Sequence, residues 1–208
     1  MKNAKEEIMC EDATKLAEMS QENFVKDGRV YIMGPFDRSI SSKVIPDFIG
    51  LIDCIRFSKQ PAIEIFINSG GGYSSELYAL LSVIDMAKEE GIKIVTYNMG
   101  IAGSCASMLA VVGDERYMSR FGVNYPHLGQ TSYKAETFEQ MERENKRVKD
   151  WMNQTVDIYA AHTKIKRAQL MKFLADDNWN LNVDECLKYG FCDKVIGFEK
   201  QQQVQAGK

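Results

Sequence analysis

Strand-like and helix-like segments alternate through the first half of this chain, and this alternation constrains its fold more than any other feature. The run AIEIFIN at residues 62–68 alternates along its length and is rich in isoleucine, which predicts a strand. Residues 74–90 carry apolar side chains at helical spacing and precede Gly91, which predicts a helix that ends there. Residues 93–99 predict the next strand. Strand and helix in units of roughly thirty residues are typical of βαβ crossovers, so we expect an α/β fold around a parallel sheet.

The same patterns predict further elements on both sides of this unit. RVYIMG at residues 29–34 predicts a strand that ends at a Gly-Pro step, and the apolar spacing over 41–57 predicts a helix. The stretch MGIAGSCASML, residues 99–109, follows a strand and is predicted to begin the next helix. A short helix near 165–174, then the segments NVDECLKYG and KVIG, complete the expected fold.

Residues 136–162 form a charged segment that predicts one long helix. One seam along it advances by alternate steps of three and four residues over about three heptads, as in a coiled coil. The seam positions are Phe138, Met141, Asn145, Val148, Met152, Thr155 and Tyr159. We expect a helix of this length and pattern to pack against another chain or to lie across its own domain.

Length and composition fit one domain of the ordinary globular type. The chain has 208 residues, of which 45% are apolar and 26% are charged. No internal repeat or linker divides the sequence. We expect a mobile N-terminal arm over residues 1–28, one domain over 29–198 and a polar tail over 199–208.

Charge and cysteine content exclude several classes of function. A net charge of −3 provides no basic field to attract nucleic acid or an anionic membrane surface. The N-terminal segment carries acidic residues throughout and lacks the apolar core of a signal peptide, and no run approaches the ~18 apolar residues of a membrane span. The five cysteines are odd in number and form no C-x-x-C pair, which favours reduced thiols over a zinc site. These features predict a soluble cytoplasmic protein.

Two predicted strand ends carry residue types suited to binding or catalysis. Gly70, Gly71 and Gly72 follow the strand at 62–68, and glycines allow positive φ and close approach of a ligand to backbone N–H groups. The alternative interpretation is a flexible turn between a strand and a helix. The pattern is not G-x-G-x-x-G and no Walker lysine follows it, which argues against a nucleotide phosphate site.

Ser104, Cys105 and Ser107 lie in the small-residue stretch after the second of these strands. At a helix N-terminus, Ser104 has two alternative roles. As an N-cap its hydroxyl would accept a hydrogen bond from the first helical turn, which is worth roughly 1 kcal/mol. As a nucleophile it would gain from the N–H groups of that turn, which stabilise an oxyanion.

Few residues compete for the roles of base and orienting acid. His162 is predicted to end the long helix, where the helix dipole favours a structural role. His127 precedes a glycine-containing loop, where functional groups are often presented. Asp176 and Asp177 lie near Trp179, either as solvated turn residues or as an acceptor that holds His127 in the tautomer of a base. Together with a serine, these residues indicate nucleophilic catalysis.

Seven motifs, in this order, resemble the Clp protease proteolytic subunit (ClpP) family: RVYIMG, INSGGG, GIAGSCAS, ERYM, NYPHLG, DDNW and ECLKYGFCDKVI. The resemblance covers residues 29–196. It implies a ClpP/crotonase-like α/β fold of repeated ββα and βαβ units, with the long helix as a protruding handle. It also implies a serine endopeptidase without a cofactor, assembled as two stacked heptameric rings (a tetradecamer) and supplied with unfolded polypeptide by an AAA+ unfoldase ATPase.

The resemblance also implies the roles of particular residues. They are Ser104, His127 and Asp177 as the catalytic triad, the N–H groups of Gly72 and Cys105 as oxyanion donors, and Gly70, Gly71 and Tyr73 as substrate-binding residues. No residue is implied to bind a metal. The exposed backbone of the turn would hold the substrate as an added extended strand.

Some positions depart from the family pattern, and three alternatives stay open. Gly70 replaces a proline of the family, so the turn is less rigid, and Cys105 replaces a methionine, which leaves the backbone donor in place. One alternative is a ring subunit that assembles without cutting. Another is an acyl-CoA enzyme of the crotonase type, whose glycine-rich turns hold a thioester oxygen. The third is a peptidase with Cys105 as its nucleophile.

Overall fold

The computed structural model describes residues 28–58, 62–129, 132, 134–176 and 179–197. The predicted arm (apart from Gly28), the predicted tail and Asp177 lie outside the described residues. The elements in chain order are β1 (Arg29–Ile32), the π-helical turn η1 (Ile40–Val44), α2 (Ile45–Ser58), β2 (Ala62–Ser69), α3 (Ser74–Glu89), β3 (Lys93–Gly103), α4 (Cys105–Val111), β4 (Glu115–Ser119), β5 (Val123–Tyr125), α5 (Phe138–His162), α6 (Arg167–Leu174), α7 (Val183–Tyr189) and β6 (Lys194–Ile196).

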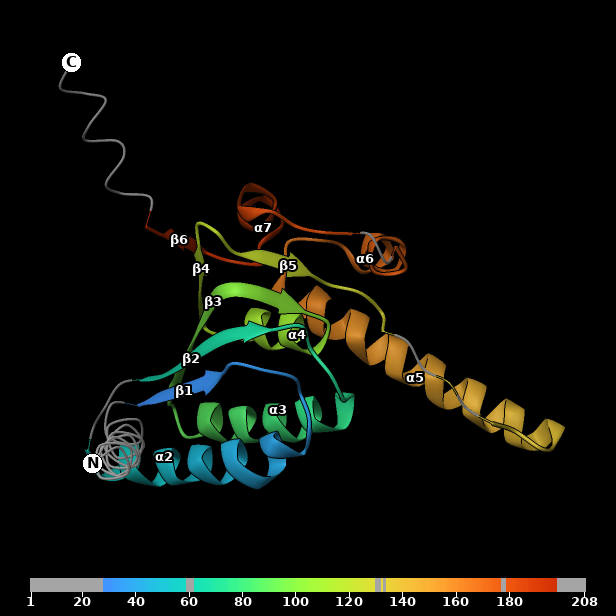
Figure 1. Ribbon diagram of the computed structural model, residues 1–208, viewed down its shortest axis with the longest axis horizontal. Coiled ribbons are helices and arrows are strands. Elements are labelled where there is room, and N and C mark those ends of the chain that lie inside the picture. The colour runs from blue at the N-terminus through green and yellow to red at the C-terminus, as the bar shows by residue number, and fades with distance from the viewer. Residues whose placement is uncertain (1–27, 59–61, 130–131, 133, 177–178, 198–208) are drawn as a thin grey trace, which may run out of the picture.

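The strands named above form one sheet in which each neighbouring pair is parallel. They lie in the order β1-β2-β3-β4-β6, and β5 pairs with the end of β3. Figure 1 shows α2 and α3 side by side, α4 next to β3, and α5 extending away from the sheet. The parallel α/β fold predicted from the alternating segments is confirmed.

Burial on one face explains the alternation within β2. Ile63, Ile65 and Ile67 are fully buried, whereas the residues between them are partly exposed. These isoleucines share one core with Leu77 and Leu80 of α3. Burying each such side chain contributes roughly 1.5–3 kcal/mol. This core holds the strand end from which the glycine turn begins.

The opposite face carries a row of aromatic rings across four neighbouring strands. Tyr31, Phe66, Tyr97 and Tyr117 occupy matching register positions in β1 to β4. The centroids of neighbouring rings are 5.2, 4.7 and 5.0 Å apart, within the range of favourable stacking. The row therefore reinforces the parallel register from the side opposite the isoleucines.

β3 continues past its predicted end and replaces the start of the predicted helix. It runs to Gly103, and α4 begins only at Cys105. After a register shift, Ser69 of β2 pairs with Ala102, and the same segment of β3 pairs with β5 on its other side. Pairing on both edges satisfies the backbone groups of this small-residue segment and keeps it extended.

α5 matches the predicted long helix and begins slightly later. Thr137 and Gln140 form a capping box at its N-terminus. The buried residues are confined to its C-terminal part: Thr155, Val156 and Tyr159. At the other end, Phe138 and Met141 are 64% and 39% exposed, so the seam packs on its own domain over one end only. Within the described residues, no helix has both the length and the apolar character that a membrane span requires.

Candidate active site

Ser104 occupies the junction between β3 and α4. Its φ of 52° and ψ of −121° make it the one non-glycine residue with positive φ in the described part of the chain. Ser104 stands at the N-cap position of α4, yet its hydroxyl accepts no hydrogen bond from the first turn. Strain of this kind costs about 1–3 kcal/mol and is typical of turns that present a functional side chain. The capping role is therefore not the one that this hydroxyl performs.

The glycine turn packs directly against Ser104. Gly71 has a φ of 99°, and a Cβ built there would lie 2.6 Å from Ser104 Cβ and 2.7 Å from the Gly103 carbonyl oxygen. Gly72 has a φ of 153°, and a Cβ there would lie 2.3 Å from the Phe36 carbonyl oxygen. Any larger residue would collide with backbone at both positions. Close packing thus explains these two glycines.

The backbone N–H groups of Gly72 and Cys105 were predicted as oxyanion donors, and the structure shows their surroundings. Cys105 is the first residue of α4, so its N–H has no acceptor in a preceding helical turn. In the turn, the Gly71 carbonyl accepts from the Phe36 N–H at 2.9 Å, and the Tyr73 N–H donates to the Phe36 carbonyl at 2.7 Å. The Gly72 N–H lies between these groups and takes no part in the pairing with Phe36.

β5 brings His127 to the same end of the sheet as Ser104. Gly103 pairs with Tyr125, whose carbonyl accepts from the Ser104 N–H at 2.9 Å, and His127 follows two residues later. The structure describes the side chains of both Ser104 and His127, and no hydrogen bond joins them. Instead, the Gly129 N–H donates to His127 Nδ1 at 2.9 Å. In a neutral imidazole, an acceptor at Nδ1 places the ring proton on Nε2, so the ring is not poised to take a proton there.

Asp177 lies outside the described residues, but residues before and after it in the sequence form backbone hydrogen bonds with the segment that carries the predicted base. The Leu128 N–H donates to the Leu174 carbonyl at 2.9 Å. Further along, Asn124 and Leu181 exchange two backbone hydrogen bonds of 3.0 and 2.8 Å. Leu174 and Leu181, which lie on either side of Asp177 in the sequence, are therefore both hydrogen-bonded to the segment that carries His127.

A buried hydrogen-bond network links α4 to α5 and β5. The Tyr159 hydroxyl donates to Ser107 Oγ at 2.9 Å, and the Ser107 hydroxyl donates to the side-chain oxygen of Asn124. Tyr159 and Ser107 are fully buried, and Asn124 nearly so. Ser107 thus has an internal role. The sequence indicates Tyr159 only as a seam position, and no pattern in it indicates Asn124.

Arg116, rather than His162, supplies the positive charge at the C-terminal end of α5. Its guanidinium donates to the carbonyl groups of His162 and Gly190 and pairs with Asp193. Burial, together with the nearby cations Lys88 and Arg116, lowers the pKa of His162 and favours its neutral form. The favourable charge–dipole role predicted for His162 therefore belongs to Arg116.

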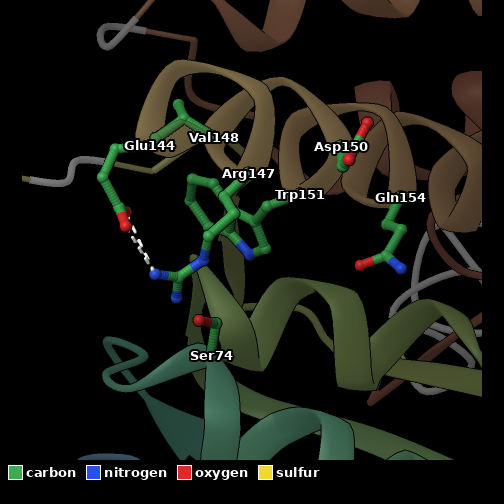
Figure 2. Close-up of a pocket in the computed structure, with 7 residues that line it drawn as sticks. All are labelled: Ser74, Glu144, Arg147, Val148, Asp150, Trp151 and Gln154. Carbon is green, nitrogen blue, oxygen red and sulfur yellow. Dashed lines mark hydrogen bonds and ion pairs between the residues drawn. The ribbon is translucent and has the colours of Figure 1, made fainter. Parts of the chain in front are cut away.

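A polar pocket of about 350 Å³ lies between the start of α3 and α5 (Figure 2). The residues that line it are Ser74, Glu144, Arg147, Val148, Asp150, Trp151 and Gln154. Arg147 pairs with Glu144 at 2.9 Å, and Figure 2 shows Ser74 facing α5 from the opposite wall. Trp151 also packs against Gly129, where a Cβ would lie 2.4 Å from its ring. The pocket therefore adjoins both the glycine turn and the loop after the histidine.

Comparison with known proteins assigns the family. The sequence matches the family model described as Clp protease over residues 12–199. It is similar to an ATP-dependent Clp protease proteolytic subunit of Deinococcus radiodurans, with 27% identity over 179 residues, which are 83% of this chain and 81% of that protein. A protein of the same name from Porphyromonas gingivalis is 28% identical over 194 residues, 91% of this chain and 83% of the relative. The resemblance carried by the sequence motifs is thereby confirmed: the chain belongs to the Clp protease family.

Proposed function

We propose that this chain is the proteolytic subunit of a Clp-type serine endopeptidase that hydrolyses peptide bonds of unfolded polypeptides. One observation carries the proposal: Ser104 has a strained backbone at a helix N-terminus, does not cap that helix and packs against a glycine turn. A serine that only capped α4 would not need this strain. The family and the names of the two relatives support the same activity.

In the proposed reaction, Ser104 Oγ attacks the peptide carbonyl carbon while His127 Nε2 takes the hydroxyl proton. The N–H groups of Gly72 and Cys105 stabilise the oxyanion that forms. When the C–N bond breaks, His127 returns the proton to the leaving amine. Water then attacks the acyl-enzyme by the same route and releases Ser104.

His127 has to change its hydrogen bonding before it can act as this base. Nε2 accepts a proton only when the ring proton is on Nδ1, the atom to which Gly129 donates in the structure. In the working site, Asp177 would accept a hydrogen bond from Nδ1–H and Gly129 would move away. The proposed active state therefore differs from the described one in the loop after His127.

We further propose that the chain works in the cytoplasm as two stacked heptameric rings that enclose the sites and receive polypeptide from an AAA+ unfoldase. The exposed apolar side chains of Phe138 and Met141 support a contact between subunits through α5, because a single chain leaves this end of the seam uncovered.

The variant Ser104→Ala tests the proposed function. Peptide hydrolysis should fall by at least about 10³-fold, because the nucleophile is lost, while the particle size stays unchanged. Ser82→Ala is the matched control, because Ser82 lies on an exposed side of α3 and its hydroxyl donates to the Tyr78 carbonyl. We expect the control to keep the wild-type rate. Turnover retained in Ser104→Ala would reject the assignment.

A ring subunit that assembles without cutting is the second candidate. The hydrogen bond from Gly129 to His127 Nδ1 favours it, because a histidine locked in that tautomer does not activate a serine. Covalent labelling by a phosphonate probe separates the two candidates, because the probe reacts with an activated hydroxyl only.

A further inference from the structure

The thiol of Cys105 connects the start of α4 to the glycine turn. Its Sγ–H donates to the Gly72 carbonyl oxygen at 3.2 Å, and Cys105 is 2% exposed. The same two residues carry the N–H groups proposed to bind the oxyanion. The side chain of one proposed donor residue is thus hydrogen-bonded to the main chain of the other.

This contact holds the peptide group between Gly72 and Tyr73 from its second edge. On the first edge, the Tyr73 N–H donates to the Phe36 carbonyl at 2.7 Å. On the second, the Gly72 oxygen accepts from the thiol. Three consecutive glycines otherwise give the turn wide backbone freedom. Among the described residues, no other hydrogen bond joins this turn to α4.

We infer that Cys105 is a positioning residue, whose thiol fixes the spacing between the Gly72 and Cys105 N–H groups beside Ser104. The inference rests on the proposed function, because an oxyanion is what requires both donors at once. Donors that are already in place contribute most to the rate, since they do not have to reorient as charge develops.

The surroundings of the thiol argue against a nucleophilic role for it. Attack requires the thiolate, and burial raises the pKa of the Cys105 thiol, which keeps it protonated. Its proton is also engaged by the Gly72 oxygen. The hydrogen bond, rather than reactivity, is therefore the property to test.

The variants Cys105→Ala and Cys105→Ser test the inference in the full-length assembled protein, with a fluorogenic peptide as substrate. Alanine removes the hydrogen-bond donor, whereas serine keeps a donor that lies closer to its own Cβ. Displacing an oxyanion donor weakens an interaction made in the transition state, so it should lower kcat. The fall should be smaller than the roughly 10²–10³-fold that follows when a donor is deleted. We expect kcat of Cys105→Ala to fall about tenfold with KM within about twofold, and Cys105→Ser to recover to within about threefold of wild type.

Cys192→Ala is the matched control. Cys192 is also buried, at 3% exposure, and its thiol makes no hydrogen bond among the described residues. Its removal should leave kcat unchanged. Amide hydrogen exchange adds a readout that does not depend on activity: residues 70–73 should exchange faster in Cys105→Ala than in wild type or Cys192→Ala.

The outcomes separate this inference from the proposed function. An unchanged kcat in Cys105→Ala, an equal fall in the alanine and serine variants, or unchanged exchange at residues 70–73 would overturn the positioning role alone. Wild-type protein that neither cleaves peptides nor reacts with a phosphonate at Ser104 would instead reject the proposed function, and the inference with it.

Discussion

Ser104 keeps its positive φ because backbone hydrogen bonds and close packing fix its conformation. Its N–H donates to the Tyr125 carbonyl, and its own carbonyl accepts from the N–H groups of Ser107 and Met108. Gly71 packs against its Cβ. Strain of about 1–3 kcal/mol persists only where the surroundings over-determine a conformation. At the scale of single residues, the candidate site is thus specified by backbone packing as much as by side chains.

Gly71→Ala should destabilise the protein by about 1–3 kcal/mol, because the new Cβ would meet Ser104 Cβ at 2.6 Å in a backbone conformation that alanine disfavours. Urea unfolding measures this change. Gly70→Ala is the control, since nothing lies within 4 Å of a Cβ there, and it should change stability by less than about 1 kcal/mol. Equal losses in both variants would contradict the close packing of the turn.

Sequence patterns predict some of these residue-scale features and not others. The triad implied by the resemblance requires Ser104 and His127 to lie close together, and the pairing of β3 with β5 brings the two segments to one end of the sheet. The hydrogen bonds from Gly129 to the imidazole and from Cys105 to the turn were not predicted. Each depends on where a single N–H or S–H group points, and no periodicity encodes that direction.

At the scale of elements, α4, α5 and β5 meet at the buried hydroxyl of Ser107. Ser107→Ala should lower the free energy of unfolding by about 1–3 kcal/mol, because the Tyr159 hydroxyl and the Asn124 side-chain oxygen would lose a buried partner. Chemical denaturation measures the loss. Ser82→Ala removes an exposed hydroxyl and should cost less than about 0.5 kcal/mol. A loss that small in Ser107→Ala would contradict the importance of the network.

The ion pair of Arg116 with Asp193 joins β4 to the segment before β6 and predicts a dependence of stability on pH. Partial burial alone would raise the pKa of Asp193, but hydrogen bonds from Arg116 outweigh it and hold that pKa below its ordinary value. A carboxyl whose folded pKa is depressed stabilises the fold above its unfolded pKa, roughly 3.9, and this contribution is lost as pH falls through the folded value.

Asp193→Asn should therefore unfold at a lower temperature than wild type at pH 7, and the difference should shrink as the pH falls below about 4. Thermal unfolding followed by circular dichroism across this range measures both effects. Asp53→Asn removes one partner of an exposed pair on α2 and should shift the transition less. A difference for Asp193→Asn that stays constant with pH would contradict the role of the ion pair.

The ends of elements that depend on local sequence signals were predicted more accurately than the ends that depend on pairing between strands. The helix predicted over 74–90 is observed as Ser74–Glu89, because its periodicity and the positive φ of Gly91 both act locally. The end of β3 depends on a register shift in β2 and on β5, which is distant in the sequence. A pattern read within one segment therefore places the end of that strand too early.

At the scale of the whole molecule, the uncovered end of the α5 seam predicts assembly. Phe138→Ala with Met141→Ala should reduce the particle mass relative to wild type without loss of helix content, because these exposed apolar side chains would lie between subunits. Light scattering coupled to size exclusion measures the mass. Lys146→Ala with Lys149→Ala, on the same helix but off the seam, should assemble as wild type. An unchanged mass in the seam variant would count against this contact.

Labelling with a phosphonate probe, followed by mass spectrometry of the digested protein, shows whether Ser104 is an activated nucleophile. If the strained serine at the start of α4 is activated by the imidazole of His127, a single adduct should form on Ser104. The adduct should be absent from Ser104→Ala and from His127→Ala. Folded, assembled wild-type protein that takes up no probe, or takes it up at another serine, would contradict the account.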